Sequence, residues 1–442
     1  MTARRTRHHP QAVLAVASFA LSIVLAACNS TSPTPSLSPS PSLAPSAVPS
    51  SPADSPVPSE APASPSEGAS AADPIYDEIE QEVAEMRGLQ PTGDVDRRTI
   101  DRAELTTEIE KLYRAEAPPE LVAARERFYK ALDLLPADAS LEDLEIEMLS
   151  AGVAGYYRDD QKRLYVVSTS GNVGATEKIT FAHEFNHALQ DQHYPIFKEQ
   201  EDVTNRTDWL MARQALYEGD SSLLMTLWAS QNFSGEDFQD LLQEGLNDPS
   251  QQILERMPAI LREPLLYPYT TGLGFVQGQY GSGGWEAVDA MYEAVPETTE
   301  QVLHPEKYEA GEDAIAIELP DDLEERIGPG FERTLDDTFG EFQTSVWLSD
   351  AGVANASEAA AGWGGDRVVV LDDGTNWAAL LATEGDSAAE AAEFEAAAGP
   401  AVAALANPAA LFEGGSETAR WVVAASSNDV LEAVAQALGL AS

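Results

Sequence analysis

The sequence predicts an α+β protein, with a mainly helical domain that contains a small β-hairpin and a small C-terminal α+β unit. Apolar residues recur at helical spacing through most of residues 75–292. The pattern changes to that of β-strands near residues 155–167 and again after residue 366. With 442 residues, the chain is long enough to hold two or three domains, each with its own hydrophobic core.

The first residues predict an export signal that is not part of the fold. Three arginines within the first seven residues precede an apolar run from Ala12 to Ala27, which is short for a membrane span. The run leads into Cys28 through Leu-Ala-Ala, which resembles the lipobox of bacterial lipoprotein signals. The resemblance implies that residues 1–27 are a signal peptide. It also implies that Cys28 is diacylated and anchors the protein to the outer face of the bacterial cell membrane. The alternative is a chance cysteine after an ordinary signal peptide.

The next segment, residues 29–73, is rich in Ser, Pro and Ala and has no hydrophobic periodicity. Together with the lipidated cysteine it forms a predicted disordered tether over residues 28–73. At about 3.1 Å per residue, the tether could extend to roughly 140 Å. Because Cys28 is the only cysteine, we expect no disulfides and no thiolate metal ligands in the mature chain.

The chain is strongly acidic, with 74 Asp and Glu residues against 26 Lys and Arg and a net charge of −48. A field of this sign repels nucleic acid and anionic lipid surfaces. We therefore expect no nucleic-acid partner, and a membrane contact only through the lipid anchor.

We predict that residues 74–350 form the main domain and residues 351–442 the C-terminal unit. In the main domain we expect helices at residues 75–87, 101–116, 119–134 and 141–149, a β-hairpin at residues 155–157 and 164–167, and further helices from 176 to about 292. In the C-terminal unit we expect strands at residues 367–371, 377–383 and 419–425, and helices at 388–398, 401–406 and 429–438. Gly399-Pro400 should end the first of these three helices. The unit contains no His, so we interpret it as a structural or substrate-positioning module.

Three of the four histidines outside the signal peptide fall between residues 183 and 193. His183, Glu184 and His187 form the pattern H-E-x-x-H on a predicted helix, for which Thr176 is the expected N-cap. A spacing of four residues places both imidazoles on one face, one turn apart, so both can bind one metal ion. Glu184 projects beside that face, where its carboxylate can accept a proton. The alternative is a chance match, with two ordinary histidines on a polar helix face.

A catalytic zinc ion needs a third protein ligand, which leaves the fourth position for water. His193 follows His187 at the spacing of the third histidine in metzincins, but Gln190 stands where those enzymes need Gly. Glu218 lies in a helical stretch in which Gly219 would let two helices approach closely. We favour Glu218 as the third ligand of one Zn²⁺ and keep His193 as the alternative.

With Glu218, the site resembles that of gluzincins, zinc peptidases whose third ligand is a Glu on a second helix, often followed by Gly. The chain is also similar to a largely uncharacterised group of exported, predicted zinc peptidases. The matching segments are residues 155–157, 183–193, 218–220 and 300–308. The resemblance spans roughly residues 75–310 and implies a zincin-like metallopeptidase domain.

The resemblance also implies two features around the site. The hairpin would lie beside the active-site helix, and one of its strands would be an edge on which an extended peptide could pair. Gluzincins often place an acid four residues after the ligand Glu, but this chain has Ser222 there. The side chain that supports a ligating histidine is therefore open, with Asp191 and Asp220 as candidates.

His304 is the only other histidine outside the signal peptide, and Pro305 favours a loop at this position. We predict a catalytic role for His304 as a donor to the oxyanion; the alternative is a surface loop residue. Tyr267, Tyr280 and Tyr308 are rival donors.

These features predict zinc-dependent peptide-bond hydrolysis at the cell surface, with a protein or peptide substrate. Glu184 would act as general base toward a zinc-bound water and deliver the proton to the leaving amine. The alternative is a non-catalytic surface lipoprotein that uses a structural zinc as a binding or scaffold module. In that case both Glu218 and His193 would bind the ion. Residues 75–150 could also act as a pro-segment.

Overall fold

The structure is a computed structural model that describes residues 73–168, 173–200 and 203–440. The predicted signal peptide, the lipid site at Cys28 and the tether up to residue 72 lie outside the described residues. Within the described part of the chain, no helix has both the length and the apolar content to cross a membrane.

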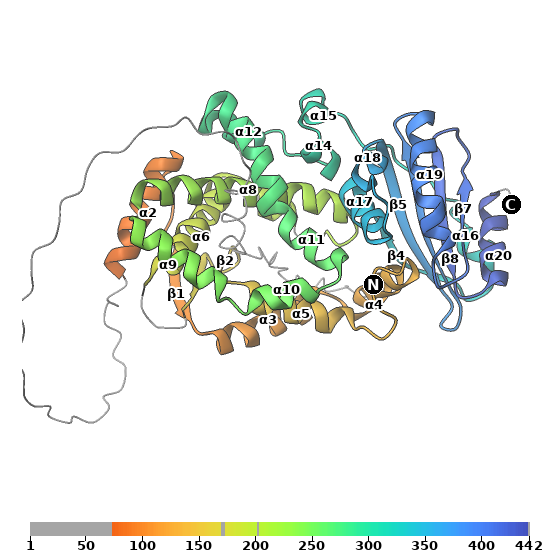
Figure 1. Cartoon of the computed structure of the whole chain (residues 1–442), viewed down its shortest axis with the longest axis horizontal. Helices are drawn as coiled ribbons and strands as arrows, with labels where there is room; N and C mark the ends of the chain where they lie inside the picture. Colours follow the sequence, from red (N-terminus) through yellow and green to blue (C-terminus); the bar gives the residue numbers. More distant parts are fainter. Residues whose placement is uncertain (1–72, 169–172, 201–202, 441–442) are drawn as a thin grey trace, which may run out of the picture.

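The chain folds as an α+β protein, which confirms the predicted fold class. Figure 1 shows a mainly helical part next to a larger sheet that is covered by the last helices. The elements before the hairpin are α2 (Asp73–Arg87), β1 (Asp96–Ile100), α3 (Arg102–Glu116), α4 (Pro119–Ala131) and α5 (Leu141–Gly152). The four helices match the predicted ranges closely, whereas β1 was not predicted.

The small sheet has three strands. β2 (Gly155–Arg158) and β3 (Arg163–Val167) pair as the predicted antiparallel hairpin. β1 runs parallel to β3, which gives the order β1-β3-β2. β2 is therefore an edge strand, and it packs against α6 (Ala175–His193). The hairpin thus lies beside the helix that carries the H-E-x-x-H pattern.

Two long helices, α6 and α8 (Thr207–Asn232), pack against each other in the middle of the helical part (Figure 1). Phe181, Phe185 and Leu189 of α6 are buried in a core shared with α2. Ring stacking of Phe181 on Tyr76, with centroids 4.2 Å apart, joins the two helices. The opposite side of α6 faces α8, so α6 is buried over most of its length.

The N-cap predicted for α6 at Thr176 is wrong. Gly174 is the N-cap, and its backbone N–H donates to the side chain of Glu177 at 2.9 Å. The hydroxyl of Thr176 instead donates to Glu244 in the helix at residues 235–246. Half of a capping box is thus present: the side chain of Glu177 accepts from the backbone N–H of the cap residue, while glycine has no side chain that could accept from the first turn in return.

Further short elements complete the helical part. They are α7 (Ile196–Glu199), α9 (Gly235–Leu246), α10 (Ser250–Arg256), α11 (Ala259–Tyr267), the π-helical turn η1 (Pro268–Gly272), α12 (Leu273–Gly283), α13 (Trp285–Met291), α14 (Thr299–Leu303) and α15 (Pro305–Ala310). The next helix, α16 (Leu323–Ile327), already packs on the sheet of the C-terminal unit. Gly219 of α8 and Gly272 of η1 meet closely, because a Cβ on Gly219 would lie 2.4 Å from Gly272 O. The expected close approach at Gly219 is thus observed.

The C-terminal unit contains an antiparallel sheet of five strands in the order β4-β5-β6-β8-β7. Its elements are β4 (Glu332–Asp337), α17 (Gly340–Asp350), α18 (Ala356–Ala360), β5 (Trp363–Asp372), β6 (Trp377–Gly385), α19 (Ala388–Ala403), β7 (Ala409–Glu413), β8 (Ala419–Ala425) and α20 (Asn428–Leu438). Residues of β5 alternate between two cores: Val368 and Val370 face α17 and α19, while Val369 and Leu371 face α16 and α20.

Parts of this unit differ from the sequence prediction. The helix expected to end at Gly399-Pro400 continues through both residues to Ala403, because Ala398, Ala401 and Val402 pack into the core on its buried face. Strands β4 and β7 were not predicted. Because β4 pairs with β5, the sheet begins before the predicted domain limit at residue 351.

Candidate metal centre

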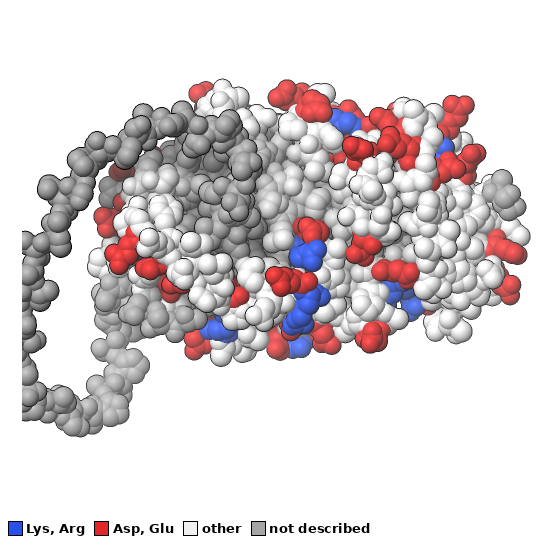
Figure 2. Space-filling model, in the orientation of Figure 1, with Lys and Arg blue, Asp and Glu red and all other residues white. Residues whose placement is uncertain are grey.

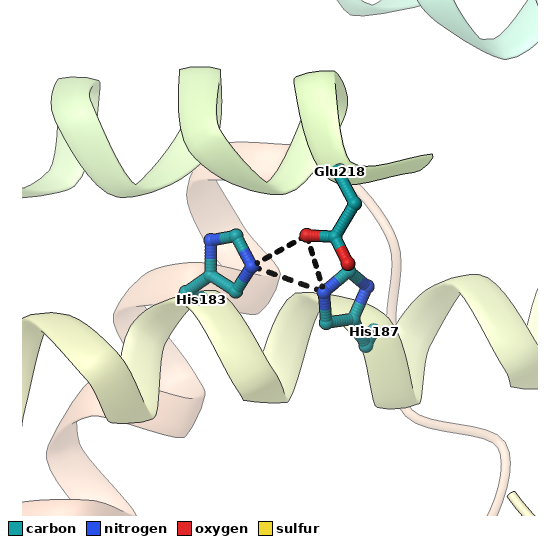
Figure 3. Close-up of side chains that lie close together, drawn as sticks. All are labelled: His183, His187 and Glu218. Carbon is teal, nitrogen blue, oxygen red and sulfur yellow. Dashed lines mark hydrogen bonds and ion pairs between the residues drawn. The ribbon is translucent and has the colours of Figure 1, made fainter. Parts of the chain in front are cut away.

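Three side chains that can bind a metal ion converge between α6 and α8. His183 and His187 project from α6, and Glu218 reaches them from α8 (Figure 3). The Nε2 atoms of the two histidines are 3.0 Å apart. Glu218 Oε2 lies 3.1 Å from Nε2 of His183 and 3.3 Å from Nε2 of His187. All three side chains are fully buried. The structure thus brings the predicted histidine pair and the predicted carboxylate to one point.

The donor set and its dimensions fit a zinc ion. Catalytic zinc is commonly bound by two imidazoles and one carboxylate, with ligand atoms about 2.0–2.2 Å from the ion. Tetrahedral ligands at that radius lie about 3.3–3.6 Å from one another. The separations of 3.0–3.3 Å among the three atoms are slightly smaller, so an ion fits after a small outward movement.

Without a metal ion, the three side chains of the cluster hold one proton, and their pKa shifts show that it lies on His187. Burial lowers the pKa of His183, which favours its neutral form. Burial also opposes the charged form of His187, but the adjacent carboxylate of Glu218 outweighs this effect and raises the pKa of His187 to about 9. Burial would raise the pKa of Glu218, but the positive charge of His187 outweighs it and lowers this pKa to about 2. The metal-free cluster therefore holds an imidazolium beside a carboxylate.

Glu184 lies next to this cluster, and a glycine makes room for it. Glu184 is fully buried, and its charge contributes to the raised pKa of His187. A Cβ on Gly155 of β2 would lie 3.2 Å from Glu184 Cγ and 2.6 Å from Cγ2 of Thr180. Only glycine at this position lets the edge strand pack so closely against α6.

A cavity of about 1200 Å³ opens beside the first half of α6. Its walls come from α3, α5, the hairpin, α6 and the segment that joins α9 to α10. Ala154, next to Gly155, and Thr180, one turn before Glu184, both line it. The cavity therefore lies along the first turns of α6 and ends one turn before Glu184. Neither Glu184 nor any of the three ligands is among the residues that line it.

His193, the alternative third ligand, is not part of the cluster. It is exposed at the end of α6, and its Nε2 lies 2.8 Å from the carbonyl oxygen of Gln90. Six residues after His187 the helix is still intact, so the side chain of His193 is carried away along the axis. The structure groups Glu218, and not His193, with the histidine pair.

The catalytic role predicted for His304 is not supported by its contacts. Its Nε2 lies 2.9 Å from Oε1 of Glu341 on α17, and its Nδ1 is 3.8 Å from Glu306. His304 stands between two short helices whose packing turns it toward the C-terminal unit. Its contacts thus join α14 to α17 and do not include a residue of the metal centre.

The segment around His304 makes a second contact with the C-terminal unit. Lys307 Nζ pairs with Glu300, Glu312 and Asp386, the last of which lies between β6 and α19. The three carboxylates form a second group with metal-ligating geometry, but the ammonium of Lys307 occupies its centre. We therefore interpret this group as an ion-pair cluster.

Sequence analysis missed Tyr269, which contacts the metal centre from η1. Tyr269 is buried, its ring centroid is 6.2 Å from that of His183, and its hydroxyl bonds to Glu218. Burial, followed by the charges of Glu218 and Glu184, raises the pKa of Tyr269 well above its usual value. The hydroxyl therefore keeps its proton and can donate it in a hydrogen bond.

The three tyrosines considered from the sequence point elsewhere. Tyr267 donates to Thr299 O at 3.4 Å, Tyr308 donates to Ala294 O at 2.7 Å, and the ring of Tyr280 packs on Trp285. A π-helical turn shifts the following side chains around the helix axis, and such turns are frequent at functional sites. Pro268 and Gly272, which bound this turn, were the only local signal in the sequence.

A family model described as a domain of unknown function (DUF8575) matches residues 325–436. The match lies in the C-terminal unit and includes neither α6 nor α8. No curated protein and no solved structure matches the chain.

Proposed function

We propose that this protein is a zinc-dependent peptidase of the HExxH type, similar to gluzincins, with Glu184 as its general base. The observation that supports the proposal most is the convergence of His183, His187 and Glu218 in one cluster. The histidines share a helix face by their spacing alone, but Glu218 lies 35 residues after His183 on another helix. A chance H-E-x-x-H pattern gives no reason for a distant carboxylate to reach both Nε2 atoms.

The residues around the cluster have the chemistry that peptide hydrolysis needs. A zinc ion bound there supplies a Lewis acid that polarises the scissile carbonyl and lowers the pKa of a water molecule. Glu184 accepts the proton of the attacking water and passes it to the leaving amine. Tyr269 donates its hydroxyl hydrogen to the carbonyl oxygen as negative charge develops there.

The surroundings support an extended peptide as the substrate. β2 is an edge strand next to α6, so its outer edge can pair with a peptide backbone. The neighbouring cavity of about 1200 Å³ has room for several side chains of such a peptide. Acidic side chains are spread over the surface drawn in Figure 2, which favours a protein substrate over nucleic acid. We further propose that the enzyme acts at the outer face of the cell membrane, anchored through Cys28.

The proposal is tested with Glu184→Gln, which keeps the size of the side chain and removes its basicity. We expect the purified variant to retain one zinc ion per chain and to lose cleavage of an unstructured protein substrate. Glu358→Gln, an exposed change on α18, serves as the control with the same chemistry and should cleave at the wild-type rate. A zinc-loaded Glu184→Gln variant that cleaves like the wild type would refute the mechanism.

The complete burial of the three ligands favours a second candidate, a non-catalytic lipoprotein with a structural zinc. A structural site is normally closed by four protein ligands. His193, the expected fourth ligand, instead contacts the carbonyl of Gln90, which supports the peptidase. One zinc ion per wild-type chain without cleavage of protein substrates between pH 5 and pH 9 would favour the structural role.

A further inference from the structure

A buried chain of hydrogen bonds leads from the metal centre to Arg87, the last residue of α2. Nδ1 of His187 lies 2.9 Å from Oε1 of Gln190. Nε2 of Gln190 donates to Oδ2 of Asp220 at 3.2 Å. Asp220 in turn accepts hydrogen bonds from Arg87: from Nε to Oδ1 at 3.0 Å and to Oδ2 at 3.3 Å, and from Nη2 to Oδ2 at 3.1 Å. Gln190 and Asp220 are fully buried, as is Arg87.

The partners of Gln190 determine which way its amide points. Three acceptors lie within reach of the two hydrogens on its nitrogen: the carbonyl oxygen of Tyr217 at 2.9 Å, Asp220 at 3.2 Å and Oγ of Ser221 at 3.2 Å. The amide oxygen is therefore the atom that faces His187, and it accepts a hydrogen bond from Nδ1–H. Oγ of Ser221 is a second, more distant partner of the same Nδ1, at 3.2 Å. With the proton fixed on Nδ1, Nε2 of His187 is left as the metal-binding nitrogen.

Arg87 is the positively charged partner of the buried Asp220 side chain. Apart from Arg87, Asp220 accepts hydrogen bonds from Gln190 and from the hydroxyl of Tyr292, at 2.7 Å. A buried carboxylate without a charged partner is strongly unfavourable. Nη1 of Arg87 also pairs with Oδ1 of Asp289 at 2.6 Å, so the guanidinium group is fixed in place.

We infer that Arg87 is a positioning residue of the metal centre, acting on His187 through Asp220 and Gln190. The inference rests on the proposed zinc site, and it makes α2 an integral part of that site and not a removable pro-segment. Loss of Arg87 leaves the buried carboxylate of Asp220 without a charged partner, so we expect this carboxylate to move. The hydrogen bond that it accepts from Gln190 then weakens, and the amide oxygen of Gln190 holds the ring of His187 less firmly. Removal of such supporting contacts weakens metal binding by about 10- to 100-fold.

The test measures zinc affinity by competition with a chromophoric chelator for Arg87→Met and for a control, Arg97→Met. Arg97 also connects α2 to the rest of the fold, through ion pairs with Asp77 and Glu80, but it has no contact with Asp220. Both variants lose one positive charge and one anchor of α2. We expect about 10- to 100-fold weaker zinc binding for Arg87→Met, and an affinity within about twofold of wild type for Arg97→Met.

Two further measurements separate positioning from a general loss of structure. The visible spectrum of the Co²⁺-loaded protein reports the ligand geometry, and we expect it to change in Arg87→Met and to recover in Arg87→Lys. Gln190→Met interrupts the same chain without leaving a buried charge unpaired. It should weaken zinc binding by itself, and adding Arg87→Met to it should weaken binding little further. This variant also provides the test if Arg87→Met does not fold.

A folded Arg87→Met protein with wild-type zinc affinity and cobalt spectrum would overturn the inference. An effect of Arg87→Met that is equally large with and without Gln190→Met would also overturn it. A wild-type protein that binds no zinc would overturn this inference and the proposed function together. A wild-type protein that binds zinc without cleaving peptides contradicts the peptidase alone, because the inference is judged on the zinc affinities.

Discussion

Zinc binding at pH 7 should release one proton, because only one of the three ligands is protonated before the ion binds. Burial keeps the pKa of His183 below its usual value, and the pKa of Glu218 is lowered to about 2. Both groups are therefore already deprotonated at pH 7. Glu218 raises the pKa of His187 to about 9, against the effect of burial, so this imidazole carries a proton that zinc must displace.

The size of the effect follows from the pKa of His187. Because this pKa lies above 7, zinc affinity rises with pH, about tenfold per unit, and levels off above a pH of about 9. At pH 7 the competition with the proton costs about 2 to 3 kcal/mol of zinc binding free energy. Protonation of His187 also stabilises the metal-free fold. This stabilisation is fully present below a pH of about 6.5 and is lost as the pH rises through about 9.

The assay is titration calorimetry of the metal-free protein with zinc at pH 7, in buffers of different ionisation enthalpy. The dependence of the measured heat on the buffer gives the number of protons released, which we expect to be close to one. Glu218→Gln is the matched control. It removes the charge that holds the proton on His187, so binding should be weaker and release close to zero protons. Release of no proton by the wild-type protein would refute the reasoning.

Three further predictions concern the surroundings of the cluster. Gly155→Ala places a Cβ 2.6 Å from the methyl carbon of Thr180 on α6 and should lower the free energy of unfolding, measured by chemical denaturation, by about 1–3 kcal/mol. An unchanged denaturation midpoint would show that β2 can move away from α6. Tyr269→Phe should lower kcat/KM about 10²- to 10³-fold with zinc content unchanged, whereas Tyr267→Phe should not, and equal effects would argue against an oxyanion donor. Burial raises the pKa of Asp208 to about 7 and that of Glu341 to about 8. Both carboxyl groups favour their neutral form in the folded protein, so the folded state is most stable below a pH of about 4 and loses this stability as the pH rises through 7 to 8. The Tm of the metal-free protein, in which zinc binding does not add its own pH dependence, should therefore be higher at pH 6 than at pH 8.5, and a constant Tm would contradict this.

The parts of the fold that the sequence predicts well are those in which local pattern and tertiary role agree. The hairpin has clear periodicity and is observed close to its expected range, and α6 begins within one residue of the helical stretch expected from residue 176. Glu218 could be selected because Gly219 indicated a close helix contact, which the structure shows at Gly272 of η1. Gly219 thus predicted a contact with a segment about 50 residues further along the chain.

The missed parts depend on contacts that no local pattern reveals. β1 reads Asp-Arg-Arg-Thr-Ile and is mostly exposed, so only its backbone pairing with β3 makes it a strand. Tyr269 is aimed by a π-helical turn whose bulge is stabilised by packing on α8. A catalytic role was predicted for His304 because it was the one histidine without another role. That reasoning contains no information on where the side chain lies. Its observed partner, Glu341, comes from the C-terminal unit.

The C-terminal unit is more than an appendage, because it caps the helix that carries the third ligand. The N-cap residue of α8, Arg206, makes no capping hydrogen bond with its side chain. Instead Asp337, at the end of β4, accepts hydrogen bonds from the backbone N–H and the hydroxyl of Thr207, both at 2.7 Å. The first N–H groups of a helix need such acceptors, and a carboxylate there is also favoured by the helix dipole. Glu218 lies about three turns further along the same helix. The unit that matches a family of unknown function thus stabilises the start of α8, and with it the position of Glu218 opposite the histidine pair.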